Sequence, residues 1–279
     1  MDIILSTIYL IFLEDYMITL KSDREIKGMQ EAGDIMVGLF HALEDYIKPG
    51  ITTWDVDHFA YEFIIAHDAT PGELNFEGYK YSTCVSVNDM ICHGCPSKDI
   101  LVKDGDLLKV DTVINYHGYL SDSCHAFVAG TPSPEVKKLM DVTLKALYLG
   151  IDQAVVGNRI GDIGWAIQNY AENEMGYGVV REYIGHGIGP TMHEKPDVPH
   201  YGEAGHGTRL KAGMTITIEP MVNIGDWRSG ETADDGWTVR TLDGSLSCQY
   251  EHTLVVTDDG PKILSSYDHD FDAKYLWNK

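Results

Sequence analysis

The sequence has little basic charge, few cysteines and no long apolar run. Its 279 residues carry 21 Lys and Arg against 43 Asp and Glu, a formal net charge of −22. A surface this acidic repels phosphate, and no local basic patch stands out that would bind nucleic acid or an anionic membrane. The five cysteines are too scattered for a disulfide framework, which favours the reducing cytoplasm.

The most apolar stretch of the chain lies at its N-terminus. The eleven residues from Ile3 to Leu13 are too few to cross a bilayer, and Asp2 stands where a secretory signal would be basic. Met17 comes shortly before a strong helix start. We therefore expect residues 1–16 to be an extension of unknown role beside a single domain of residues 17–279. The alternative is that they pack onto the domain as an extra strand or helical turn.

Helix starts are marked in both halves of the chain. Ser22 with Glu25 three residues later forms a capping box, and Thr53 is expected to cap a second helix. The segment 133–135, Ser-Pro-Glu, predicts a third helix, and a fourth is expected from about Asp162.

Two patterns recur at nearly the same spacing along the chain. The break at Gly50 aligns with a break at Gly157, 107 residues later. The segment 103–111 matches 211–219, and each runs from a turn through an apolar strand to a carboxylate. One match would be an ordinary turn-and-strand signal, but two matches indicate a duplication. We expect two related α/β halves, with equivalent carboxylates meeting between them. These halves cover about 17–130 and 131–265.

Asp111 and Asp122 flank a predicted β-hairpin. A two-residue turn at Tyr116 and His117 would place Asp111 directly opposite Asp122, with Cβ atoms about 5 Å apart. Two like charges this close destabilise a sheet unless a cation neutralises them. Carboxylates at solvated strand ends would need no cation, but the neighbouring apolar residues favour a buried sheet. The pair therefore predicts a metal site.

The second half of the chain supplies further ligands of the same type. Glu219 and Glu251 lie within apolar β-runs, and a glycine-rich loop presents His186 and His193. An unpaired ionised carboxylate in such surroundings would cost about several kcal/mol, so each needs a cation, a strong set of hydrogen-bond donors, or a proton. Four carboxylates and one neutral imidazole carry a charge that two divalent ions balance. Oxygen-rich ligation with a single imidazole favours Mn, Fe or Co over structural zinc.

Together these motifs resemble type I methionine aminopeptidase, from about Met17 to Leu264. The resembling segments are Cys92-His93-Gly94, Val110-Asp111, Ser121-Asp122, Gly185–Gly189, His193-Glu194, Thr217–Met221 and Gln249–His252. The resemblance implies a pita-bread fold of class α/β (α+β), with two pseudo-symmetric halves around a central antiparallel sheet. It also implies that residues 17–279 form one catalytic domain.

The resemblance implies a role for each ligand. Asp111 would bind one metal ion, His186 and Glu219 the other, and Asp122 and Glu251 would bridge both. The cofactors would be two divalent ions (Co, Mn, Fe or Zn), which together activate a water. The implied activity is hydrolytic removal of the initiator methionine from nascent proteins and peptides with a small second residue.

The resemblance also implies catalytic and substrate-binding residues. Glu219 would move a proton, and His93 and His193 would lie at the scissile peptide bond. The substrate-binding residues would be Phe76, Tyr79, Cys84, His93, His193 and Trp237. Glu73 and Met192 depart from the residues usual in the family, and both are expected near the methionine pocket.

Two alternatives and several properties stay open. The fold also serves Xaa-Pro aminopeptidases and creatinase-like hydrolases, and an inactive pita-bread protein could act as a binding module. The expected partners are nascent polypeptide N-termini, with no specific nucleic acid and no membrane. A monomer in the cytoplasm is expected, and a transient ribosome contact is left open. His200 and His206, in a glycine-rich loop, are expected to be solvated.

Overall fold

The computed structural model describes residues 18–265 as a mixture of helices and antiparallel strands. The expected extension 1–16 and its apolar run lie outside the described residues. Across 18–265, no helix combines the length and the apolar character needed to cross a membrane. The helices are α2 (Asp23–Tyr46), α3 (Thr53–Ala66), α4 (Pro134–Ile151) and α5 (Ile160–Gln168), with the short turns η1 (Phe76–Gly78) and η2 (Asn169–Glu174).

The strands are short except for one long hairpin. They are β1 (Thr70–Pro71), β2 (Cys84–Val87), β3 (Met90–Cys92), β4 (Leu107–Tyr116), β5 (Tyr119–Val128), β6 (Gly178–Val179), β7 (Gly185–Gly187), β8 (Glu194–Val198), β9 (Thr215–Ile218), β10 (Met221–Asn223), β11 (Val239–Arg240), β12 (Ser247–Gln249), β13 (His252–Thr257) and β14 (Gly260–Ile263). Strand β4 pairs with β1, β2 and β5, and a second sheet has the order β14-β13-β9-β7-β8. The smaller sheets are β12-β10-β6 and β11-β3.

The helix starts follow the capping signals, with one correction. Ser22 and Glu25 form the predicted capping box, in which the Ser22 backbone N–H donates to the Glu25 carboxylate at 2.7 Å. The cap of α3 is Thr52, so the expectation of Thr53 was wrong by one residue. The box requires a carboxylate three residues after the cap, and Asp55 accepts the Thr52 backbone N–H at 2.7 Å.

The two halves share the backbone geometry that the duplication predicts. Gly50 and Gly157, in the turns that follow the first helix of each half, both have φ near +97°. Gly105 and Gly213, in the turns before β4, which carries Asp111, and before β9, which leads into Glu219, both have φ near +87°. Only glycine adopts such values without strain, so the same residue type recurs at both positions in each half.

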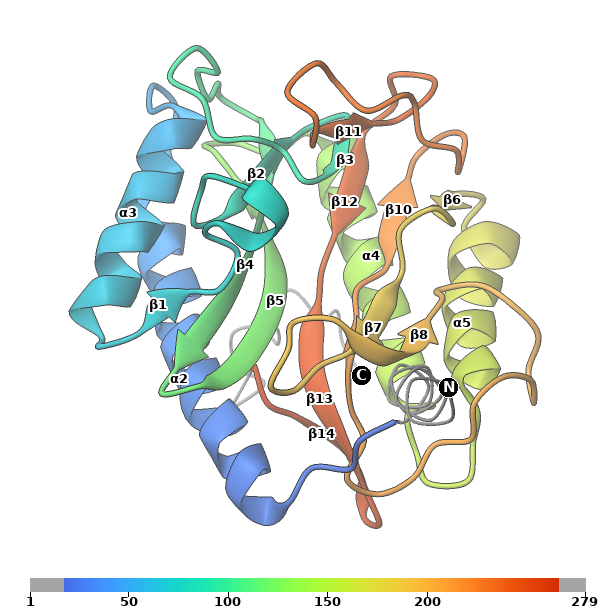
Figure 1. The fold of residues 1–279 in the computed structure, drawn as a ribbon. Coiled ribbons are helices and arrows are strands. Elements are labelled where there is room, and N and C mark those ends of the chain that lie inside the picture. Colours follow the sequence, from blue (N-terminus) through green and yellow to red (C-terminus); the bar gives the residue numbers. More distant parts are fainter. Residues whose placement is uncertain (1–17, 266–279) are drawn as a thin grey trace, which may run out of the picture.

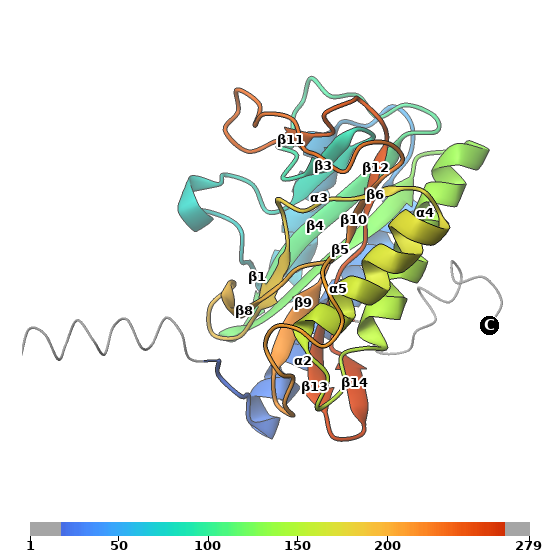
Figure 2. The ribbon, with the colours of Figure 1, turned by 90° about the vertical axis from the view of Figure 1, so that its right-hand side faces the viewer.

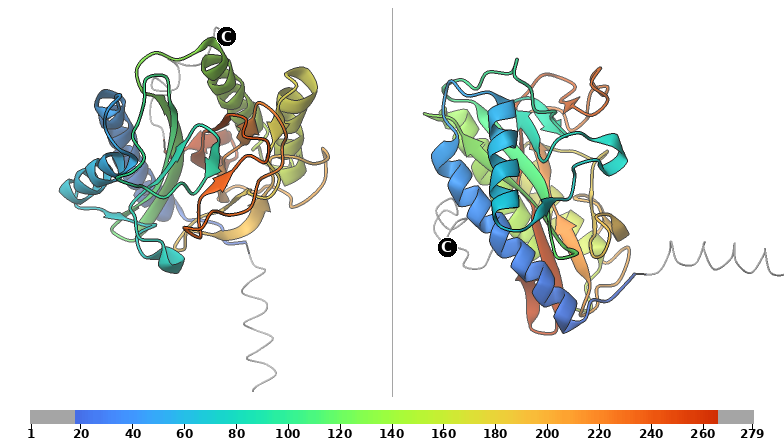
Figure 3. Two further views of the ribbon diagram at one scale, coloured as in Figure 1. Left: turned by 90° about the horizontal axis from the view of Figure 1, so that it is seen from above. Right: turned by 60° about the vertical axis from the view of Figure 1, so that its left-hand side comes forward.

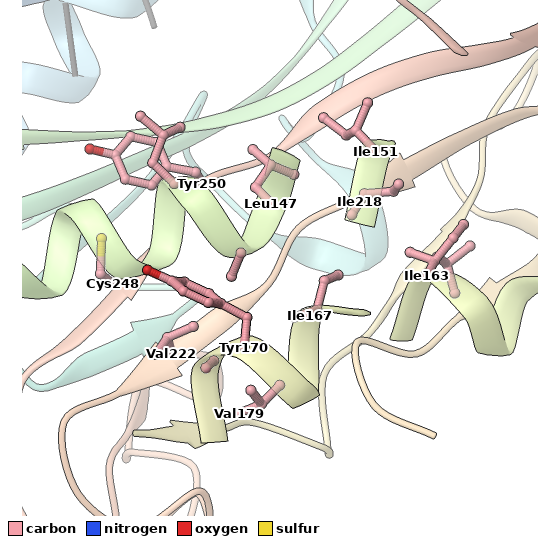
Figure 4. Packing of buried hydrophobic residues seen from close by; sticks show 14 of the residues in the cluster. Leu147, Ile151, Ile163, Ile167, Tyr170, Val179, Ile218, Val222, Cys248 and Tyr250 are labelled. Carbon is pink, nitrogen blue, oxygen red and sulfur yellow. The ribbon is translucent and has the colours of Figure 1, made fainter. Parts of the chain in front are cut away.

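Strands run through the middle of the molecule and helices cover their outer faces. Helices α2 and α3 lie on the left in Figure 1 and side by side in the right-hand view of Figure 3, where α2 packs against β4 and β5 and α3 against β1 and β2. Helices α4 and α5 lie together on the other half, as Figure 2 shows. Figure 4 shows their apolar side chains, among them Leu147 and Ile167, packed with Val222 of β10.

The β4–β5 hairpin differs in register from the sequence expectation. Its turn residues are His117 (φ 52°) and Gly118 (φ 88°), one position later than predicted. A type I′ turn needs positive φ at both central residues, and Gly118 meets that need at the second. Asp111 therefore lies opposite Cys124, not opposite Asp122. Because the pairing shifts by two residues, Asp122 stays on the same face of the sheet, diagonal to Asp111.

Direct hydrogen bonds join the two halves beside these carboxylates. Thr253 of β13 accepts the backbone N–H of Asp122 at 3.0 Å, and its hydroxyl donates to the carbonyl of Asp122 at 2.8 Å. The backbone N–H of Glu251 donates to the Cys124 carbonyl at 2.9 Å. These bonds fix the acidic residues of both halves against one another, as the duplication leads one to expect.

Candidate metal centre

All the site residues expected from the sequence line one cleft of about 810 Å³. They are Phe76, Tyr79, Cys84, His93, Asp111, Asp122, His186, His193, Glu219, Trp237 and Glu251. They come from both halves of the chain and from separate sheets, so the fold assembles the cleft from distant segments.

Three potential ligands form the centre of the cleft. One side-chain ligand atom from each of Asp122, His186 and Glu251 lies within 4.8 Å of the others. Nε2 of His186 is 3.7 Å from an oxygen of Asp122 and 3.6 Å from Oε1 of Glu219. Asp111 adjoins this group through the Glu251 carboxyl group. The five residues therefore form one cluster.

The loop around His186 determines which ring nitrogen faces the carboxylates. The His186 backbone N–H donates to the Thr217 hydroxyl at 3.0 Å, and Nδ1 lies 3.0 Å from the Gly187 carbonyl. That bond leaves Nε2 free to act as a metal ligand. A Cβ at Gly185 would stand 2.6 Å from the Thr217 carbonyl oxygen, so glycine is needed for strand β7 to approach β9 this closely.

Glu219 is held by three groups at the end of β9. Its Oε1 accepts the Thr217 hydroxyl at 2.9 Å, and Nε2 of Gln249 lies 3.5 Å from Oε2. The Glu219 backbone N–H donates to Nε2 of His200 at 3.0 Å. These contacts leave one side of the carboxylate directed toward the cluster.

The position of His200 corrects the expectation that this residue is solvated. His200 is completely buried, because the chain after β8 passes beside the end of β9 and places the ring under Glu219. Burial lowers the pKa of His200 to about 3, so the ring is neutral and accepts the Glu219 amide hydrogen. His206 is exposed, as expected.

The carboxylates of the cluster lack cationic side chains to balance them. Burial raises the pKa of Asp111 to about 7, and burial with the neighbouring carboxylates raises the pKa values of Asp122, Glu219 and Glu251 well above the ordinary range. Within residues 18–265, no Lys or Arg forms an ion pair with any of the four. Oε1 of Glu251 is buried without a hydrogen-bond partner. This donor set fits divalent cations.

Aromatic rings and one thiol form the wall beside the cluster. Tyr79 is buried, donates its hydroxyl to the Thr83 carbonyl at 2.9 Å and meets the Trp237 ring edge-on at 5.0 Å. Both carboxylate oxygens of Glu73 lie 3.9 Å from Sγ of Cys84. The wall is thus mostly apolar, with one acidic group within it.

Two histidines lie between this wall and the cluster. The His193 ring is 4.4 Å from the His186 ring and 5.4 Å from Phe76. Burial lowers the pKa values of both His93 and His193, which keeps the two rings neutral near pH 7. His93 also has φ near +55°, a strained value for a residue with a side chain.

Two residues of the site were missed by the sequence reasoning. Tyr183 lines the cleft and packs edge-on against His93 at 5.4 Å, but its segment carries no pattern that would single it out. His200 was noted and misjudged. Its position two residues after the end of β8 becomes informative only once β8 is known to lie near β9.

The match to a known family decides what this cluster belongs to. Residues 27–258 match the profile of metallopeptidase family M24. The chain belongs to metallopeptidase family M24. It is 46% identical to methionine aminopeptidase A of Synechocystis, over 89% of this chain and 97% of that protein. It is 44% identical to methionine aminopeptidase 1 of Bacillus subtilis, over 89% and 99% of the two chains.

Solved structures confirm the pita-bread fold of this M24 protein. The methionine aminopeptidase of Rickettsia prowazekii superposes with a TM-score of 0.88 at 39% identity, covering 90% of this chain and all of that one. The prolidase of Pyrococcus horikoshii matches less well, with a TM-score of 0.72 at 26% identity, and only 66% of that chain is covered. The Xaa-Pro alternative is therefore not favoured.

Proposed function

We propose that this M24 protein is a metallo-aminopeptidase that hydrolytically removes the initiator methionine from nascent proteins and from peptides with a small second residue. The observation that carries the proposal is the meeting of the acidic cluster with an aromatic and thiol-lined wall in one cleft. The cluster can bind metal, and the wall can hold a thioether side chain. Its relatives named methionine aminopeptidases support the same activity.

The residues fit two divalent ions, held by Asp111, Asp122, His186, Glu219 and Glu251. Four carboxylates with one neutral imidazole carry the charge that two such ions balance. Oε1 of Glu251 has no hydrogen-bond partner, and no described Lys or Arg pairs with the four carboxylates, so the cluster needs positive charge. Ions bound there would act as Lewis acids and lower the pKa of a water toward neutrality. The same ligands accept Co, Mn, Fe or Zn, so availability would select the metal.

The protein's own groups would handle the proton and the peptide bond. Glu219 is placed to take and return a proton at the cluster, because Thr217 and Gln249 hold its carboxylate there. His193 and His93 are neutral rings at the edge of the cluster, and each can donate an N–H to the scissile peptide group. The three residues would thus bind, orient and protonate the substrate.

The wall of the cleft would hold the methionine side chain. Tyr79, Trp237 and Phe76 present ring faces and edges, and Cys84 places a thiol beside the substrate's thioether. A thioether gains dispersion energy and sulfur–aromatic contacts in such surroundings. The α-amine of the substrate would then lie at the acidic cluster.

The remaining properties follow from this activity. Nascent N-termini would be the partners, and a monomer in the cytoplasm suffices to meet them. Residues 17–279 would form the single catalytic domain, with halves of about 17–130 and 131–265, and residues 1–16 an extension. The acidic surface gives no support for direct binding of nucleic acid.

A substrate panel tests the proposal. Protein reconstituted with Mn²⁺ or Co²⁺ is incubated with Met-Gly-Ser, Met-Leu-Ser and Ala-Pro-Ser peptides, and released amino acids are separated and measured. We expect methionine from the Met-Gly peptide, far less from the Met-Leu peptide and no alanine. Alanine release without methionine release would indicate an Xaa-Pro peptidase, and binding without any release would indicate an inactive module.

A further inference from the structure

A buried ion pair joins the N-terminal end of the described chain to the loop at the cleft. Nζ of Lys21 lies 2.6 Å from Oε2 of Glu194, with the two side chains 4% and 15% exposed. Thr19 completes the arrangement, since its hydroxyl accepts from Lys21 at 2.5 Å and donates to Glu194 at 2.9 Å. We call these three residues the Lys21 clamp.

The Lys21 clamp is tightly fitted to its surroundings. A Cβ at Gly189 would collide with the Lys21 side chain and with the Glu194 carboxylate. The Lys21 backbone N–H donates to the Gly213 carbonyl at 2.7 Å, in the turn that precedes β9. Burial would raise the pKa of Glu194, but the hydrogen bonds from Lys21 and Thr19 hold it below its ordinary value. The clamp thus links the turn before β9 to the start of β8.

The link matters because Glu194 directly follows His193. In the part of the chain that the structure describes, the His193 ring makes aromatic contacts with His186 and Phe76 but no hydrogen bond. Its position over the cluster therefore depends on its backbone. The backbone of this loop is anchored on one side by Glu194, whose carboxylate also lies 3.4 Å from the Thr191 amide nitrogen.

We propose that Lys21 is a positioning residue for the peptidase reaction, acting through Glu194 to hold His193 at the scissile peptide bond. The inference rests on the proposed function of His193. A buried ion pair is not needed for stability alone, because a well-packed apolar pair would serve as well. Its directional hydrogen bonds instead fix one loop geometry. A displacement of about 1 Å at a catalytic group can cost about 100-fold in rate.

A double-mutant cycle tests the inference. Lys21→Met and Lys21→Arg are made in the parent and in a His193→Ala variant, and kcat and KM are measured on a Met-Gly peptide. We expect Lys21→Met to lower kcat by about 10- to 100-fold with little change in KM. We expect Lys21→Arg to recover most of the loss, and Lys21→Met to have no further effect in the His193→Ala background. An equal loss in both backgrounds, or a change in KM alone, overturns the inference.

Amide hydrogen exchange gives a readout independent of activity. Lys21→Met should speed exchange of the amides in residues 189–194, whereas Lys103→Met, at an exposed lysine, should not. If Lys21→Met does not fold, Glu194→Gln replaces it, since it keeps the shape and removes the charge. Unchanged exchange overturns the inference. If the parent releases no methionine, the proposed function fails, and exchange still decides whether the clamp orders the loop.

Discussion

The imidazole of His200 accepts the backbone N–H of Glu219 at 3.0 Å from a fully buried position. The contact joins the chain after β8 to the end of β9, the strand that leads into a proposed metal ligand. Glu219 therefore depends on a residue outside the acidic cluster. Loss of the His200 ring would leave both a cavity and an unpaired amide.

The first prediction compares two histidines of the same loop. We expect His200→Ala to lower the free energy of unfolding by about 2–4 kcal/mol, because it opens a buried cavity and removes an acceptor. His206→Ala, at an exposed ring, should change it by less than about 0.5 kcal/mol. Urea denaturation measures both. Equal effects of the two substitutions would contradict the placement of His200.

The second prediction concerns pH in protein stripped of metal by a chelator. The pKa of Asp111 is about 7 in the folded protein, against 3.8 for an aspartate in the unfolded chain. The folded state therefore binds the proton more tightly. Stability from this group is complete below pH 4 and is lost as pH rises toward and through 7. The melting temperature should therefore fall between pH 5 and 8, and less so in Asp111→Asn. A melting temperature that rises over this range would oppose the account.

The third prediction separates stability from metal binding at Glu251. In metal-free protein at pH 8, Glu251→Gln should raise the melting temperature, because a neutral amide replaces a carboxyl group that is disfavoured by burial and by the neighbouring carboxylates. The rise in melting temperature on adding Mn²⁺ should become smaller than in the parent. Glu135→Gln, at an exposed position, serves as the control. An unchanged response to Mn²⁺ in Glu251→Gln would exclude Glu251 as a ligand.

The fourth prediction concerns the acidic group in the wall of the cleft. Glu73→Ala makes space beside Cys84, so a side chain longer by one methylene should fit better. We expect the ratio of kcat/KM for ethionyl-Gly to that for methionyl-Gly peptides to rise by about tenfold. Glu77→Ala, at the exposed edge of the same cleft, should leave the ratio unchanged. The same ratio in Glu73→Ala as in the parent would place Glu73 outside the methionine pocket.

Much of the site could be predicted because the local chemistry is visible in the sequence. Carboxylates such as Glu219 and Glu251 lie inside apolar runs, where a buried charge is costly unless it is paired or binds a metal ion. The repeated turns at Gly50 and Gly157 reveal two halves, since only glycine tolerates their backbone conformation. Capping boxes likewise mark helix starts to within one residue.

The remainder depended on contacts between distant segments. The hairpin turn was misplaced because the sequence allows its two central residues to be either Tyr116 and His117 or His117 and Gly118. The structure has the second pair, in which both residues have positive φ. His200 and Tyr183 acquire their roles from the strands and rings packed against them. No local pattern in the sequence encodes such proximity.

Methionine release by Asp122→Asn tests the central claim most directly. Asp122 lies at the meeting point of the two halves and within the ligand cluster. The variant keeps the shape of the side chain and removes its charge, and Asp258→Asn, at an exposed turn, is the matched control. With Mn²⁺ and a Met-Gly peptide, the account predicts near loss of kcat/KM in Asp122→Asn and parental activity in Asp258→Asn. Parental activity in Asp122→Asn would contradict it.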